Sequence, residues 1–197
     1  MKRIIIIDGE NLTYALRKYD KKTGGDGNRE FLSIFDFRGM LTELLEDVTF
    51  DEIIWYGAKI KVSKQNRQEL KEKTDEYLKN QGRMVNHLNK QKIVFEKVGY
   101  LRDRTIEGDS SQILKLTEKG VDVGIAVKIM ELAAEKTDYE IVLVSSDTDL
   151  LPAIDSAKKR GVSFAHIGYD YMPIYSIQKR SEYIRLITPP LFKKYKQ

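Results

Sequence analysis

Two apolar runs without polar alternation, each followed closely by acidic residues, most constrain the fold of this chain. Ile4 to Ile7 precede Asp8, and residues 141–144 (Ile-Val-Leu-Val) are followed by two serines and Asp147. Such runs are typical of strands that are buried on both faces, as in the centre of a parallel sheet. Ligands of open α/β sheets bind outside the carboxyl ends of the strands, so we expect Asp8 and Asp147 to face one cleft.

Strand-like and helix-like segments alternate along the chain. This pattern predicts an α/β fold, specifically a three-layer α/β/α sandwich with a mostly parallel central sheet. Strands are predicted at 4–7, 51–56, 93–101, 140–145, 162–167 and 183–187, and helices at 11–19, 36–47, 63–89, 121–136, 150–160 and 173–180. The polar, glycine-containing stretch 20–30 is predicted to be a flexible loop. Residues 1–188 are expected to form a single domain and 189–197 a basic C-terminal tail.

The composition excludes several classes of function. The chain contains no cysteine, which excludes disulfides, zinc–thiolate sites and thiol catalysis. No apolar stretch approaches the roughly 20 residues that a membrane helix needs, and the first strand begins too soon after Met1 for a signal peptide. We therefore expect a soluble, cytoplasmic protein that does not bind a membrane.

Positive charge is concentrated in the middle of the chain. The net charge is only +4, but residues 58–104 contain 13 Lys and Arg against 6 Asp and Glu, which gives +7. A positive region beside an acidic pocket suits a polyanion held over a bound cation. A solvated helix face is an equally good explanation of these charges.

Tyr56, Lys59 and Lys61 are the candidates for contact with nucleic acid in this region. They lie at and just beyond the end of the second predicted strand, on the side where the cleft is expected. The ring of Tyr56 is suited to stacking on a base of a single strand, and the two lysines to binding phosphates. Alternatively, Tyr56 is a partly buried residue at the end of its strand.

The segment Asp8-Gly9-Glu10-Asn11 is the first acidic motif. Gly9 permits a tight turn from strand to helix, and Asn11 can cap a helix while its amide points into the cleft. Phosphatases that form an aspartyl-phosphate need a second aspartate two residues after the first. This position is Glu10, which argues against that class.

The second acidic motif is the segment 145–149, Ser-Ser-Asp-Thr-Asp. Asp147 should point into the cleft, whereas Asp149 is in a natural N-cap position and has a structural role as its alternative. Ser145 and Ser146 can bind a phosphate or a metal-bound water, although small residues also suit a crowded strand end.

Asp122 provides a third carboxylate. It follows Lys119-Gly120-Val121 and begins a predicted apolar helix, where the helix dipole alone would favour an acidic residue. Together with Asp8 and Asp147 it would complete an oxygen-only ligand set, which suits Mg²⁺ or Mn²⁺.

The three motifs, Ile-Asp-Gly-Glu-Asn-Leu, Lys-Gly-Val-Asp-Val and Ser-Ser-Asp-Thr-Asp-Leu-Leu-Pro, together resemble those of the NYN-domain family, in its LabA-like branch of the PIN-like nuclease superfamily. They occur in the same order and span nearly the whole chain. The resemblance implies a PIN-like fold and a Mg²⁺- or Mn²⁺-dependent ribonuclease. It also implies that Asp8, Asp122 and Asp147 hold the metal and that Asp149 is a further acidic position of the catalytic site.

The resemblance extends to two polar positions and fails at one. Asn11 and Ser146 match positions that are expected to line the site. Lys128, six residues after Asp122, stands where the LabA-like pattern commonly has another acidic residue. If that residue serves the metal site in relatives, this protein would bind one ion rather than two or would have lost turnover.

The predicted function is hydrolysis of RNA phosphodiester bonds, in single-stranded RNA, by metal-activated water. Lys119 and the cations after Tyr56 would position the RNA backbone. Two alternatives stay open: a metal-dependent phosphatase or nucleotide hydrolase with the same pocket, and a non-catalytic RNA-binding regulatory protein on a PIN-like scaffold. An apolar unpaired surface on the long predicted helix would indicate a homo-oligomer.

Overall fold

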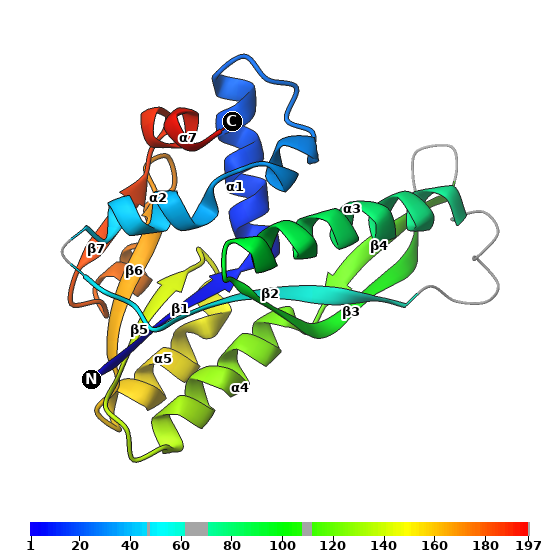
Figure 1. Cartoon of the computed structure of the whole chain (residues 1–197). Helices are drawn as coiled ribbons and strands as arrows, with labels where there is room; N and C mark the ends of the chain where they lie inside the picture. Colours follow the sequence, from blue (N-terminus) through cyan, green and yellow to red (C-terminus); the bar gives the residue numbers. More distant parts are fainter. Residues whose placement is uncertain (47, 62–70, 108–111, 197) are drawn as a thin grey trace.

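The structure is a computed structural model that describes residues 1–46, 48–61, 71–107 and 112–196 (Figure 1). The strands are β1 (Lys2–Asp8), β2 (Glu52–Lys61), β3 (Val94–Glu107), β4 (Gln112–Lys119), β5 (Tyr139–Val144), β6 (Ser163–Tyr169) and β7 (Ile184–Ile187). The α-helices are α1 (Gly9–Lys22), α2 (Phe37–Leu44), α3 (Lys71–Lys90), α4 (Val121–Ala134), α5 (Leu151–Lys158), α6 (Tyr175–Gln178) and α7 (Pro189–Tyr195). Two 3-10 helices are η1 (Glu30–Ser33) and η2 (Thr148–Leu150).

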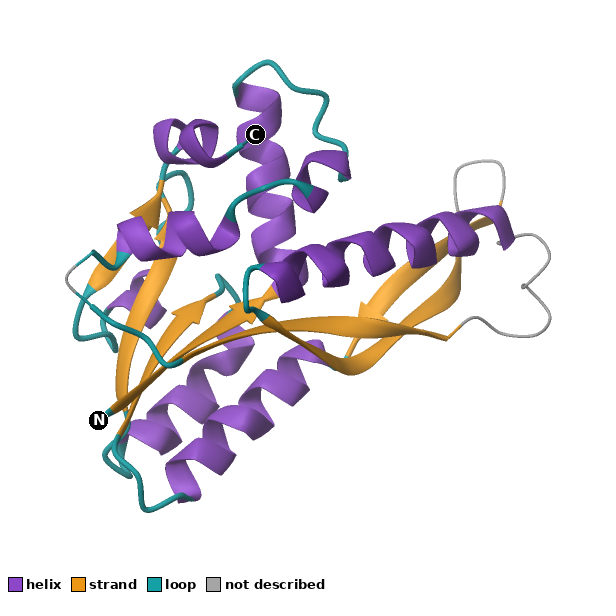
Figure 2. Ribbon diagram, in the orientation of Figure 1, coloured by secondary structure: helices purple, strands orange, loops and turns teal. Residues whose placement is uncertain are grey.

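The strands form one seven-stranded sheet in the order β4-β3-β2-β1-β5-β6-β7. Neighbouring strands are parallel except for β3 and β4, which are antiparallel. Helices cover both faces of the sheet (Figure 2). The prediction of a three-layer α/β/α sandwich with a mostly parallel sheet is therefore confirmed.

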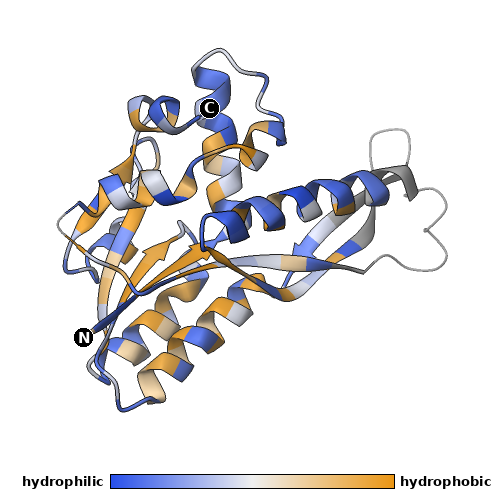
Figure 3. Ribbon diagram, in the orientation of Figure 1, coloured by the Kyte–Doolittle hydropathy of each residue, from blue (hydrophilic) through white to orange (hydrophobic). Residues whose placement is uncertain are grey.

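The central strand β1 contributes to two separate cores. Ile5 and Ile7 pack with α1, α2, α3 and α7 on one face, and Ile4 and Ile6 pack with α4, α5 and α6 on the other. All four isoleucines are at most 5% exposed. Figure 3 shows the apolar residues gathered on the central strands, whereas α3 is largely hydrophilic. Because both faces of β1 are covered in its middle, consecutive positions from Ile4 to Ile7 are all apolar.

The order in which the chain adds strands to the sheet reverses between β1 and β5. From β1 the chain adds β2 and β3 on one side and later returns to add β5, β6 and β7 on the other. Open α/β sheets bind ligands at such a switch point, outside the carboxyl ends of the strands. Asp8 is the last residue of β1, and the segment with Asp147 follows β5, so both reach this point.

The hairpin of β3 and β4 differs from the predicted pattern. Strand β3 extends to Glu107, and β4, which is absent from the predicted strands, returns beside it with Lys119 opposite Tyr100. The hairpin projects beyond the rest of the sheet together with α3 (Figure 1). Charged residues interrupt its sequence, so it lacks the apolar run that marks the central strands. The predicted start of the long helix at residue 63 lies outside the described residues.

Residues 20–30, predicted to be a flexible loop, are partly helical and are held by contacts of Asp20. Helix α1 continues to Lys22, and η1 begins at Glu30. Asp20 is 1% exposed, accepts the backbone N–H of Gly27 at 2.9 Å and forms an ion pair with Lys196.

None of the helices in the described part of the chain is long and apolar enough to cross a membrane.

The stretch predicted as a basic C-terminal tail forms α7 over residues 189–195. The side chain of Thr188 caps this helix by accepting the N–H of Leu191. Phe192 is fully buried and stacks on Phe35 with ring centroids 5.6 Å apart. The segment thus combines exposed lysines with one residue of the core.

Phe192→Leu is expected to lower the free energy of unfolding by about 1–2 kcal/mol, because it removes buried ring contacts and leaves part of their volume empty. Lys193→Ala, at the exposed neighbouring position, should change it by no more than about 0.5 kcal/mol. Urea unfolding of both variants measures this difference. Equal small effects would mean that α7 does not contribute to the core.

Candidate active site

One cavity of about 240 Å³ lies where β1, β4, α4 and the segment after β5 meet. Its lining consists of Asp8, Glu118, Lys119, Gly120, Val121, Asp122 and Asp147. We call it the acidic cavity. It brings together the three carboxylates that the sequence predicts as metal ligands, with Lys119 beside them, and it adds a fourth carboxylate, Glu118.

Asp8 is held from two sides and is 8% exposed. Its Oδ1 accepts the backbone N–H of Asn11 at 3.1 Å, so Asp8 caps α1, and its Oδ2 accepts the hydroxyl of Ser145 at 3.1 Å. Burial raises the pKa of Asp8 to about 6, and the charges of Asp147 and Glu10 act in the same direction. The two hydrogen bonds oppose this shift. A cation beside Asp8 would favour the ionised form.

Asp147 is oriented by the backbone that follows β5. Its N–H donates to Ser145 Oγ at 3.0 Å, and its Oδ1 accepts the N–H of Asp149 at 2.9 Å. Asp147, and not Asp149, is therefore the N-cap of η2. Asp149 is exposed and lies outside the acidic cavity, in a shallow hollow along α4 that also reaches Asp122.

Asp122 reaches the cavity because the chain turns sharply from β4 into α4. Gly120 has a φ of +84°, which favours glycine, and Gly99 of β3 passes close beside the turn. A Cβ at Gly99 would lie 2.3 Å from the carbonyl oxygen of Lys119. Asp122 then falls in the first turn of α4, where the helix dipole favours a carboxylate.

Glu118 lines the acidic cavity but is not among the residues predicted from the sequence. It lies near the end of β4, which runs antiparallel to β3 toward the cavity. Burial raises its pKa to about 7, and the charges of Glu10, Asp8 and Asp122 add to the shift, whereas Arg29 opposes it. Leu114, Leu116 and Glu118 occupy every second position after the turn-like sequence Gly-Asp-Ser-Ser. This spacing is the sequence pattern that indicates a strand here.

Asn11, Ser145 and Ser146 do not line the acidic cavity but hold its walls together. Asn11 Oδ1 accepts the N–H of Ser146 at 3.1 Å and the hydroxyl of Tyr169 at 2.9 Å. Asn11 Nδ2 donates to Ser146 Oγ at 2.8 Å. Ser145 is fully buried, and its carbonyl accepts His166 Nε2 at 2.8 Å. These contacts fasten the segment after β5 to α1 and position Asp8 and Asp147.

The structure gives different results for the three residues of β2 that were predicted to contact nucleic acid. Tyr56 is 3% exposed and packs in the core beneath α4, so its ring offers no face for a stacked base, which corrects that prediction. Lys59 is exposed and pairs in the sheet with Tyr100. The side chain of Lys61 lies outside the part that the structure describes.

The possible metal ligands in the acidic cavity are carboxylate oxygens, which suit a hard divalent cation. Within the described ranges, however, no three Asp, Glu, His or Cys side chains are close enough to form a ready-made metal site. Mg²⁺ usually keeps several of its waters and needs only one or two carboxylates. A hydrated ion in this cavity is therefore compatible with the arrangement.

An α/β/α sandwich with carboxylates gathered at the switch point of its sheet is consistent with a PIN-like, nuclease-type fold. The NYN domain model matches residues 2–186, and the chain belongs to this family of the PIN-like nuclease superfamily. The family prediction is confirmed, and the LabA-like branch stays a prediction.

One solved structure is similar to this chain in fold. A crystal structure of a protein of unknown function from Vibrio parahaemolyticus is similar, with a TM-score of 0.55 and 16% identity over 94% of this chain and 92% of that one. At this identity the similarity concerns the fold alone. No curated protein matches the sequence.

Proposed function

We propose that the protein is a divalent-metal-dependent ribonuclease that hydrolyses phosphodiester bonds in single-stranded RNA. The observation that supports this most strongly is the convergence of four carboxylates on one cavity at the switch point of a sheet with a nuclease-type fold. The exposed Lys119 in the lining of that cavity supplies a cation for a phosphate group.

The carboxylates of the acidic cavity, and Ser145 beside it, have three kinds of task in this proposal. Asp8, Asp122 and Asp147 would hold Mg²⁺ or Mn²⁺, which supplies Lewis acidity and lowers the pKa of water. Ser145 holds the carboxylate of Asp8 in place through its hydroxyl. Burial raises the pKa of Glu118 to about 7 in the metal-free protein, which makes Glu118 the candidate to carry a proton to or from a reacting oxygen.

The proposal is tested by incubating the protein with single-stranded RNA, structured RNA, single-stranded DNA and free nucleotides. Each substrate is combined with Mg²⁺, Mn²⁺ or EDTA. We expect cleavage of single-stranded RNA with either metal and none with EDTA. Hydrolysis of free nucleotides alone would favour the phosphatase alternative, and RNA binding without cleavage would favour a non-catalytic protein.

Lys119→Gln is expected to weaken RNA binding and to reduce the slope of log K against log salt concentration by about 0.7, because one phosphate contact is lost on a single strand. Lys136→Gln, at an exposed position beyond the far end of α4, is the matched control and should leave the slope unchanged. Fluorescence anisotropy of labelled RNA in EDTA, over a series of salt concentrations, measures both. An unchanged slope for Lys119→Gln would contradict the contact.

A further inference from the structure

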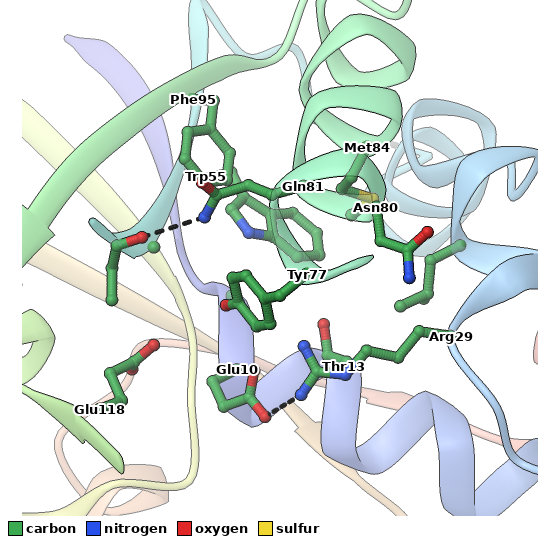
Figure 4. A pocket seen from close by; sticks show the side chains of 14 residues that line it. Glu10, Thr13, Arg29, Trp55, Tyr77, Asn80, Gln81, Met84, Phe95 and Glu118 are labelled. Atoms are coloured by element: carbon green, nitrogen blue, oxygen red, sulfur yellow. Dashed lines mark hydrogen bonds and ion pairs between the residues drawn. The ribbon is translucent and has the colours of Figure 1, made fainter. Parts of the chain in front are cut away.

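A second cavity, of about 100 Å³, lies between α1, α3 and β2 (Figure 4). One buried water needs only roughly 10–15 Å³, so this space is large enough for a small ligand. Glu118 lines both this cavity and the acidic one, which makes the two neighbours. We call the second cavity the side pocket.

One wall of the side pocket is apolar and largely aromatic. Trp55 and Phe95 contribute from β2 and β3, and Met84 from α3. Figure 4 shows the ring of Tyr77, from α3, between this wall and the polar residues opposite. The guanidinium of Arg29 lies 6.0 Å from the centre of the Tyr77 ring. Such surroundings suit a flat, aromatic ligand that stacks on side-chain rings.

The other side of the side pocket offers hydrogen-bonding groups. Glu10 lies there in an ion pair with Arg29, and Thr13 is on the same helix as Glu10, whereas Asn80 extends from α3 beside Met84 (Figure 4). Within the described part of the chain, neither the Thr13 hydroxyl nor the Asn80 amide has a hydrogen-bond partner. A carboxylate accepts only, whereas a side-chain amide both donates and accepts. Together these groups can pair with the edge of a ring that carries an amino group.

We propose that the side pocket binds a nucleobase with an exocyclic amino group and thereby selects the nucleotide next to the cleaved phosphate. Asparagine pairs in a bidentate manner with adenine, and carboxylates accept from the amino group of cytosine, whereas uracil has no such group. The placement next to the cleaved phosphate rests on the proposed function, because it follows from the shared wall at Glu118. Binding of the base itself does not require cleavage.

Trp55 makes occupancy of the side pocket directly measurable, because it is the only tryptophan of the chain. The metal-free protein is titrated with adenosine, cytidine and uridine, which carry no phosphate, while tryptophan fluorescence is recorded. Free N-acetyltryptophanamide serves as the control for absorption by the nucleosides. We expect saturable quenching by adenosine and cytidine at concentrations at least fivefold lower than for uridine, since a bidentate pair discriminates by roughly 5- to 150-fold.

Asn80→Ala should remove most of the preference over uridine, whereas Tyr77→Leu should weaken all three nucleosides alike. Asn86→Ala is the matched control, because it changes the same residue type at an exposed position of the same helix outside the side pocket. Melting temperatures establish that each variant is folded. Absence of saturable quenching, or equal affinity for the three nucleosides, would overturn the proposal.

The same measurements separate this proposal from the proposed function. Selective nucleoside binding without metal-dependent RNA cleavage would reject the ribonuclease and keep the base-binding pocket. Cleavage of oligouridylate as fast as of oligoadenylate, with no effect of Asn80→Ala, would keep the ribonuclease and reject base selection.

Discussion

Asp147→Asn is expected to reduce metal-dependent RNA cleavage at least about 100-fold while the protein stays folded. Changes to residues that only support a metal ligand already cost about 10- to 100-fold, so loss of the charge of a ligand itself should cost at least as much. The amide keeps the shape of the side chain, and its oxygen can still accept the N–H of Asp149. Turnover and melting temperature are measured on the same preparation.

Asp138→Asn provides the matched control for this variant. Asp138 is exposed and precedes β5, so it stands at the opposite end of the same strand from Asp147. Its substitution should leave cleavage and stability nearly unchanged. A folded Asp147→Asn protein with normal turnover would contradict the assignment of the acidic cavity as the active site.

Asp149→Asn decides whether the second aspartate of the motif takes part. The structure places Asp149 in the hollow along α4, outside the acidic cavity, so we expect a smaller loss of cleavage than for Asp147→Asn. A loss of equal size would mean that Asp149 moves into the site when RNA or metal binds.

The meeting of Asp8 and Asp147 in one cavity can be predicted from the sequence, because the segments before them follow a local rule. Both follow a run of four consecutive apolar residues, Ile4 to Ile7 and Ile141 to Val144, and such runs are typical of central, parallel strands. In a parallel sheet the carboxyl ends lie at one edge, so the two carboxylates have to meet. Asp122 does not follow such a strand, and its place before an apolar helix is explained equally well by the helix dipole, so its prediction depends on the other two carboxylates and on the family motif.

The errors of prediction arise where contacts between distant parts of the chain decide the outcome. Glu118 reaches the cavity through a hairpin whose length and direction leave only a weak local pattern. Phe192 is a single apolar anchor among lysines, and its burial depends on Phe35 and Phe31 from the other end of the chain. Tyr56 alternates with Trp55 across the sheet, so it points into the layer of α4 rather than along the strand into the cleft.

The raised pKa of Asp8 makes the stability of the metal-free protein depend on pH in a defined direction. The folded protein binds this proton with a pKa of about 6, against an ordinary value of 3.8. Between these two values the folded state holds more protons than the unfolded state, so the free energy of unfolding falls as the pH rises. The shift corresponds to a loss of about 3 kcal/mol, complete above about pH 6. Glu118 acts in the same direction, up to about pH 7.

Asp8→Asn is therefore expected to stabilise the metal-free protein at about pH 8, by up to about 3 kcal/mol, and to have little effect at about pH 4. The amide cannot ionise, and its one oxygen can still cap α1 by accepting the N–H of Asn11. The amide NH2 then replaces the oxygen that accepts the hydroxyl of Ser145, so the loss of this hydrogen bond reduces the gain. Urea unfolding in EDTA at both pH values gives the difference between variant and wild type, so other titrating groups cancel. Asp138→Asn should show no such dependence on pH.

Mn²⁺ should stabilise the wild-type protein, and most of this stabilisation should be absent in the Asp8→Asn variant. An ion that binds only the folded state adds about 2.7 kcal/mol when its concentration is 100 times its dissociation constant. Removal of one ligand charge weakens binding, and the electrostatic repulsion that the ion relieves is smaller in the variant. Thermal unfolding with EDTA and with millimolar Mn²⁺, at about pH 7.5, compares the two proteins. If wild type gains no stability, or if the variant gains as much, the acidic cavity is not a metal site, and a non-catalytic RNA-binding protein becomes the better explanation.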